Sequence, residues 1–160
     1  MPGGRRDRTR EDAPKTVESK DIERFECEFA YGKRDREGYT YCSFKLERME
    51  EGASCRMTGY DDLHIVFDLD FQLPRQALEE LQKVVEEYDL ARYNGRDRFT
   101  SGLPEMLGTS LLVVYKSGER IYAYDNASSV LDYRAEIAIH DFFRDLAKEN
   151  GLSLSAADQD

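Results

Sequence analysis

The residues best suited to chemistry lie in the stretch LHIVFDLDF, positions 63–71, where His64, Asp68 and Asp70 share one side of a period-two pattern. Histidine and carboxylates bind metals and transfer protons. In an extended strand, however, His64 and Asp68 are roughly 13 Å apart, whereas metal–ligand distances are about 2 Å. Only Asp68 and Asp70, roughly 7 Å apart, could share a cation, and they would need ligands from neighbouring strands. We therefore expect a solvated strand face, with no metal and no cofactor.

A nucleophile activated by a base is the second kind of site that the residues could form. His140 stands beside Asp141 and one turn from Glu136 and Arg144, which indicates the surface of a helix. The chain has no G-x-S-x-G, H-E-x-x-H, G-x-x-x-x-G-K-[ST] or G-x-G-x-x-G motif. With 33 acidic residues some carboxylate pair always exists, so such a pair carries no weight. The sequence predicts a protein that is not an enzyme, and a carboxylate-dependent hydrolase stays as an alternative.

Tyrosine usage points to recognition rather than catalysis. The chain has ten Tyr and no Trp. Strand alternation places Tyr39 and Tyr41 on the solvent side of one strand, and Tyr115, Tyr122 and Tyr124 together on one face of a later hairpin. Tyrosine offers a large contact area and a hydroxyl, and it is enriched at interfaces. The alternative is that these residues simply suit half-buried strands.

The connection over residues 90–109 is the third candidate. It has about twenty residues without a clear period, and loops of that length tend to be functional or disordered. Arg92, Arg96 and Arg98 make it mildly basic within an acidic chain. These side chains are candidates for binding an anionic group or an acidic partner. The alternative is that the apolar residues of the loop pack against the sheet as scaffold.

Composition sets the broad class of the protein. The chain has 160 residues, of which 40% are hydrophobic and 35% charged, which suits one globular domain. No apolar run approaches the length of a membrane span. The N-terminus lacks the apolar region of a secretory signal, so we expect a cytoplasmic protein. We predict a disordered charged tail over residues 1–20, one domain over 21–152 and a frayed end over 153–160.

The net charge of −10 constrains the partners. A field of that sign repels phosphate backbones, so we expect no direct nucleic-acid binding by the folded domain. It attracts basic protein surfaces instead.

The elements expected to position these residues begin with four strands. Alternation of apolar and polar residues predicts them, and short connections between them indicate an antiparallel meander with one solvated face. Their expected ranges are 23–31, 39–47, around 55–57 and 63–71. On this reading Cys27, Cys42 and Cys55 point inward as reduced core residues.

Two helices and a hairpin complete the predicted fold. An apolar period of 3.6 predicts helices from residue 74 and over 133–150. Between them, 111–115 and 120–124 flank a two-residue turn at Ser117-Gly118, which pairs Val114 with Ile121. The prediction is an α+β fold: an antiparallel sheet (four-strand meander plus a hairpin) with two helices packed on one face, in the order ββββαββα.

The function we expect is a non-enzymatic protein–protein interaction module of the inhibitor, immunity or adaptor type, which binds a basic partner through its Tyr-bearing sheet face. The first alternative is a small-ligand-sensing or regulatory domain with loop 90–109 as its lid. The oligomeric state is left open. The candidate binding residues are Tyr39, Tyr41, Asp68, Asp70, Arg92, Arg96, Arg98, Tyr122 and Tyr124.

Overall fold

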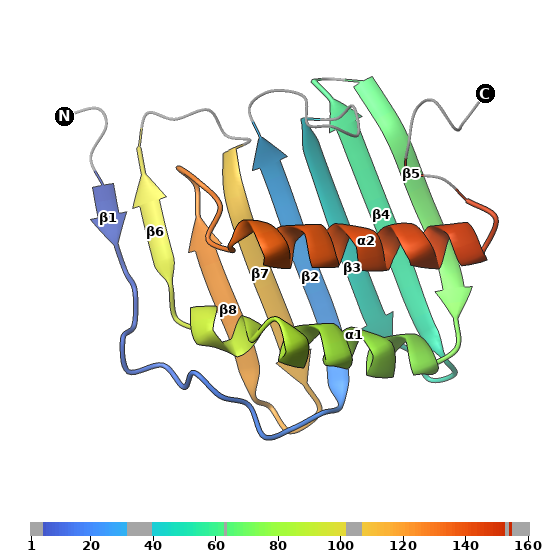
Figure 1. Ribbon diagram of the computed structural model, residues 1–160, viewed down its shortest axis with the longest axis horizontal. Coiled ribbons are helices and arrows are strands. Elements are labelled where there is room, and N and C mark those ends of the chain that lie inside the picture. The colour runs from blue at the N-terminus through green and yellow to red at the C-terminus, as the bar shows by residue number, and fades with distance from the viewer. Residues whose placement is uncertain (1–4, 32–39, 63, 102–106, 153, 155–160) are drawn as a thin grey trace.

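The computed structural model of the protein describes residues 5–31, 40–62, 64–101, 107–152 and 154. Within these ranges, eight strands form one mixed sheet, and α1 (Gln76–Glu87) and α2 (Tyr133–Glu149) both cross the same face of it (Figure 1). The predicted α+β class is confirmed. We call the face under the helices the core face and the opposite one the open face.

The sheet order is β1-β6-β8-β7-β2-β3-β4-β5, so β2 lies in the middle of the sheet. A short 3-10 helix, η1 (Leu90–Tyr93), follows α1. The strands are β1 (Arg5–Asp7), β2 (Ile22–Tyr31), β3 (Tyr41–Arg48), β4 (Ala53–Asp61), β5 (His64–Leu73), β6 (Asp97–Thr100), β7 (Leu107–Tyr115) and β8 (Arg120–Asp125).

The predicted meander is present as β2 to β5, each strand antiparallel to the next. Alternation fixes which side chains are buried: Phe25 and Phe29 on β2 have no exposed surface, and Glu28 between them is exposed. Cys27, Cys42 and Cys55 are reduced thiols with no exposed surface, as the strand parity predicts.

The prediction of a purely antiparallel sheet with six strands is wrong. β6 pairs parallel with β8, and β1 pairs antiparallel with β6 at one edge of the sheet. β6 lies inside the segment 90–109 that we expected to be a loop, and β1 consists of charged residues near the N-terminus. Strands of three and four residues are too short to show a period, and the backbone of a distant strand determines their pairing.

Residues 8–14 of the N-terminal segment contact the segment 94–97. Beyond β1 the N-terminal segment runs along the end of the sheet where the β7–β8 turn lies (Figure 1). The N–H of Arg8 donates to the carbonyl oxygen of Asp97 at 2.7 Å, and the N–H of Arg10 donates to that of Gly95 at 2.8 Å. Farther along, the Asn94 side-chain amide donates to the carbonyl oxygen of Pro14 at 2.8 Å. These bonds are made by backbone and amide groups, which composition does not predict.

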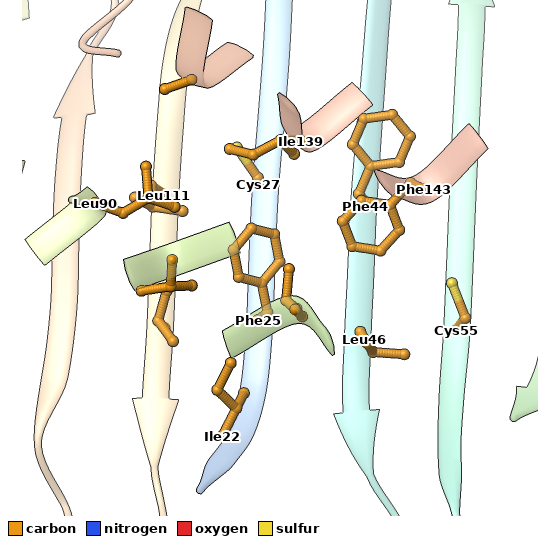
Figure 2. Close-up of a cluster of buried hydrophobic side chains, with 14 of the residues drawn as sticks. Ile22, Phe25, Cys27, Phe44, Leu46, Cys55, Leu90, Leu111, Ile139 and Phe143 are labelled. Carbon is orange, nitrogen blue, oxygen red and sulfur yellow. The ribbon is translucent and has the colours of Figure 1, made fainter. Parts of the chain in front are cut away.

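The two helices bury one aromatic core against β2 and β3. The ring of Phe143 on α2 stacks on Phe44 with centroids 4.7 Å apart and lies 5.8 Å from Phe25 (Figure 2). His140, expected on the surface of the last helix, is instead only 6% exposed and lies 4.5 Å from the ring of Phe29. That expectation is wrong because the helix lies flat on the sheet, so its buried stripe is broader than the apolar residues alone indicate.

The β7–β8 turn has one residue more than the predicted two-residue turn. The N–H of Tyr115 donates to the carbonyl oxygen of Glu119 at 2.9 Å, which leaves three residues between these two bonded residues. Gly118 has a φ of +93°, and a left-handed glycine is typical of three-residue hairpin loops.

The longer turn shifts the pairing of the hairpin by one residue. Ile121 pairs with Val113 rather than with Val114. Because neighbouring side chains on a strand point to opposite faces, the shift moves Tyr115 into the core, where it is 2% exposed. It leaves Leu112 and Val114 on the open face with the tyrosines of β8. The prediction that Tyr115 shares a face with Tyr122 and Tyr124 is therefore wrong.

A second irregularity occurs in β5, where the register shifts between the pairs Gly59–Phe67 and Tyr60–Ile65. The extra residue is a β-bulge, which reverses the facing of the residues before it. Phe67 is buried over Gly59, where an added Cβ would lie 2.3 Å from the Phe67 ring. Ile65, expected to be dry with the other odd-numbered residues, pairs with Tyr60 of the open face and is 63% exposed.

Tyr115→Phe tests the hairpin register. The Tyr115 hydroxyl donates to Oε1 of the buried Gln82 at 2.7 Å. Its removal leaves a buried oxygen without that donor, so the free energy of unfolding in urea should fall by roughly 1–2 kcal/mol. The control Tyr122→Phe, on the open face, should change it by less than about 0.5 kcal/mol. Equal, small effects would support the two-residue turn.

Candidate functional site

The open face is the largest surface of the sheet that no described helix covers (Figure 1). Cross-strand pairs share a face, so the registers order its side chains into rows across the strands. One row runs Tyr122, Leu112, Glu26, Lys45, Arg56 and Asp70; the next runs Tyr124, Ser110, Glu28, Ser43, Thr58 and Asp68; a third runs Ala30, Tyr41, Tyr60 and Ile65.

The third row is apolar and aromatic, and we call Tyr41, Tyr60 and Ile65 the aromatic row. The rings of Tyr41 and Tyr60 are 5.8 Å apart between centroids. Partial burial and the nearby charge of Glu28 raise the pKa of Tyr41, so its hydroxyl stays protonated and able to donate a hydrogen bond. Ile65 ends the row at the edge strand with most of its side chain in solvent. This row combines apolar area with two hydroxyls.

In the middle of the open face, neighbouring charged side chains form several ion pairs. Nζ of Lys45 lies 3.7 Å from Glu26 and 3.8 Å from Glu47. The Arg56 guanidinium lies 3.7 Å from Oδ1 of Asp68, which is one of the predicted binding residues. Such exposed pairs stabilise the fold little, but they fix where charge lies on the face. Asp68 and Asp70 are both exposed on β5, on the side expected from the sequence.

Tyr122 and Tyr124 lie at the other side of the open face, on β8. Both are half-buried, and burial together with the charge of Asp97 raises the pKa of each. The structure therefore separates the predicted tyrosines: Tyr41 belongs to the aromatic row, and these two belong to the β8 side. Tyr39 lies outside the described residues.

The three predicted arginines of segment 90–109 do not form one group. Arg92 follows α1 and pairs with Asp132, while its guanidinium lies 4.7 Å from the centroid of the Tyr93 ring. Arg98 on β6 lies 3.4 Å from Asp7 of β1. The backbone of Arg96 accepts a hydrogen bond from the Tyr124 N–H at 2.8 Å, and its side chain is half-buried. At least Arg92 and Arg98 thus connect parts of the scaffold.

Arg92, Tyr93, Asp132 and Ala135 form a hydrogen-bonded group that fixes the start of α2, and we call this group the latch. Asp132 is the N-cap residue of this helix, and its carboxylate accepts a hydrogen bond from the Ala135 N–H at 2.8 Å. The Asp132 N–H donates to the hydroxyl of Tyr93 at 3.1 Å, and that hydroxyl also accepts from Arg92 at 2.6 Å. The bond from Ala135, aided by Arg92, lowers the pKa of Asp132. Asp89, directly before η1, has a φ of +48°, which is a strained value for a residue other than glycine. Its conformation turns the chain so that Tyr93 reaches the start of α2.

A groove of about 500 Å³ lies beside the hairpin, between the N-terminal segment and the strands β6 and β8. No sequence pattern indicates this groove, because one of its walls is the N-terminal segment, which has no period of its own. Its charged and aromatic lining consists of Arg8, Arg10, Asp97, Glu119, Arg120 and Tyr122.

In the interior, Cys42 and His140 form a pair of residue types that is capable of nucleophilic catalysis in other settings. Sγ of Cys42 lies 4.0 Å from Nε2 of His140. A thiol and an imidazole at this distance can cooperate in nucleophilic catalysis only where a substrate reaches the sulfur. Cys42 has no exposed surface, so the pair is part of the core. Among the described residues, no group of three His, Cys, Asp or Glu side chains is placed to hold a metal ion.

Comparison with known proteins gives no relative: no family model, no curated protein and no solved structure matches the chain. In the described part of the chain, neither helix has the length and apolar character needed to cross a membrane.

Cys55 gives a test of burial on the core face. Burial, aided by the charge of Asp70, raises the pKa of this thiol from 9.0 to about 12. The unfolded chain therefore releases this proton at lower pH than the folded one, and stability falls as pH rises from about 9 towards 12. Between about pH 8 and pH 10 the wild type should lose roughly 1 kcal/mol more than Cys55→Ala, measured by urea unfolding. Parallel curves for the two proteins would contradict the assigned burial.

Asp132→Ala tests the latch at the start of α2. Loss of the N-cap acceptor should lower the free energy of unfolding by about 1 kcal/mol, and Arg92→Ala by less, because its ion pair is exposed. Since the pKa of Asp132 is lowered, the effect should be present at neutral pH and disappear as pH falls below about 4. The control Asp145→Ala, in the middle of α2, should be neutral or slightly stabilising. Equal effects from Asp132→Ala and Asp145→Ala would exclude the latch.

Proposed function

We propose that the protein is a non-enzymatic interaction domain that binds a basic protein partner through the aromatic row and the acidic side chains beside it. The observation that carries the proposal is the exposure of Ile65. A bulge turns this aliphatic side chain away from the core to the open face, where it stands next to Tyr60 and is 63% exposed. Bulges that re-aim a side chain occur beside active sites as well as at sheet edges such as β5.

The aromatic row has the features of an interface centre. Tyr41 and Tyr60 offer rigid rings with hydroxyls, and Ile65 offers an aliphatic anchor for a pocket on the partner. Because both described helices lie on the core face, a partner meets no helix when it approaches this row. Binding would remove the row from water, which is the main source of affinity in such contacts.

Charge favours a basic partner. The row next to the aromatic row carries Glu28 in its middle and Asp68 at its β5 end, both exposed. The whole chain has a net charge of −10, which speeds the approach of a positive surface. A second copy of the chain would carry the same charge and would be repelled. An inhibitor, immunity protein or adaptor of this kind acts by covering the basic surface of its partner.

Photo-crosslinking tests the proposal. Benzoylphenylalanine in place of Ile65 should crosslink to one basic protein in the native lysate, and the yield should fall when salt is raised well above about 0.15 M. The matched control is benzoylphenylalanine in place of Tyr133, which is 68% exposed at the start of α2. With the captured protein purified, Ile65→Asp should weaken binding by at least about tenfold, and Tyr133→Asp should not. Equal crosslinking from both positions, or an acidic partner, would refute the proposal.

A further inference from the structure

A second binding site, separate from the aromatic row, lies in the groove beside the hairpin. We propose that this groove binds a small phosphorylated ligand of nucleotide size, with its phosphates at Arg8, Arg10 and Arg120 and its ring against Tyr122. The inference goes beyond the proposed protein-binding function and is independent of it.

The groove is built by specific bonds, although one wall is the N-terminal segment. The hydrogen bonds of Arg8 and Arg10 to the backbone of 95–97 give this segment the spacing of a strand, so that Arg8 and Arg10 both reach the groove while Thr9 between them bonds to the Asp97 N–H at 3.2 Å. Gly95 allows the close approach: its φ is +94°, and a Cβ there would lie 2.5 Å from the carbonyl oxygen of Arg10.

The three guanidiniums are available for an anion. In the part of the chain that the structure describes, the side chains of Arg8, Arg10 and Arg120 make no hydrogen bond or ion pair. Guanidinium groups bind phosphate through paired, charge-assisted hydrogen bonds.

Of the carboxylates that line the groove, Glu119 is already engaged. It accepts hydrogen bonds from the N–H groups of Glu18 and Ser19, each at 3.0 Å, and from the Ser117 hydroxyl at 3.0 Å. These bonds lower its pKa and hold its charge on the backbone of the N-terminal segment. Asp97 is the remaining carboxylate of the lining, so the arginines outnumber it.

The size and the remaining lining indicate more than a single phosphate ion. A volume of about 500 Å³ falls within the range of small-molecule sites, which is roughly 300–1,000 Å³. Tyr122, Pro14 and Val17 add an aromatic ring and apolar surface to the lining. A base or another flat ring can pack there while phosphates meet the arginines. A nucleic-acid strand fits less well, because its other phosphates would face a chain with a net charge of −10.

Isothermal titration calorimetry of the full chain with ATP, tripolyphosphate, adenosine and a short single-stranded RNA tests the site. ATP should bind saturably, and Arg120→Ala and the double variant Arg8→Ala/Arg10→Ala should each weaken it by at least about tenfold. Arg134→Ala removes the same charge from an exposed position on α2 and should leave binding unchanged, as should Ile65→Asp. Unchanged thermal midpoints for the arginine variants would show that they fold.

Any of four results would overturn the proposal. The first is the absence of saturable ATP binding, and the second is equal ATP affinity in the wild type and the arginine variants. The third is a tighter, arginine-dependent binding of the RNA, which would assign the groove to a polymer. Tripolyphosphate binding as tight as that of ATP would contradict the placement of a ring against Tyr122.

Discussion

Burial on one side of a single sheet is the constraint on which the rest of the structure depends. Phe25, Phe29 and Phe44 point to the core face, and α2 covers them through Phe143 and His140. Because neighbouring strand residues point to opposite faces, every residue fixed in this core sends its neighbour to the open face. The surface proposed to bind a partner is therefore a direct consequence of the core.

Two departures from regular strand geometry then redistribute side chains between the faces. The three-residue β7–β8 turn brings Tyr115 into the core, where its hydroxyl bonds to Gln82. The bulge in β5 has the opposite effect and moves Ile65 into solvent. Each change involves one additional residue, yet the first buries a large side chain, Tyr115, and the second exposes one, Ile65. Exposed apolar residues at such irregularities are informative because the regular pattern would have buried them.

The three thiols are inaccessible, and two of the predicted arginines are used by the scaffold. The three thiols are buried, and burial raises the pKa of Cys27 and Cys55, which disfavours thiolate. Arg92 and Arg98 pair with carboxylates of other elements. The two surfaces that we propose for binding are the aromatic row and the groove under the N-terminal segment. They differ in chemistry, since the first is apolar with acidic neighbours and the second is lined by arginines.

Local sequence patterns determined the α+β class, the order of the main elements, the inward-facing cysteines and the facing of Asp68, Asp70 and Tyr41. These features follow from periods of 2 and 3.6, which each segment carries in its own residues. Only the tertiary structure decided the short strands β1 and β6, the burial of His140, the exposure of Ile65 and the groove. The physical reason is that these features depend on pairing with a backbone distant in sequence, on one added residue in a turn or strand, or on a helix that lies flat on the sheet. A segment such as 8–20 has no pattern of its own, and its place is set by the carbonyl and amide groups of 94–97 that it contacts.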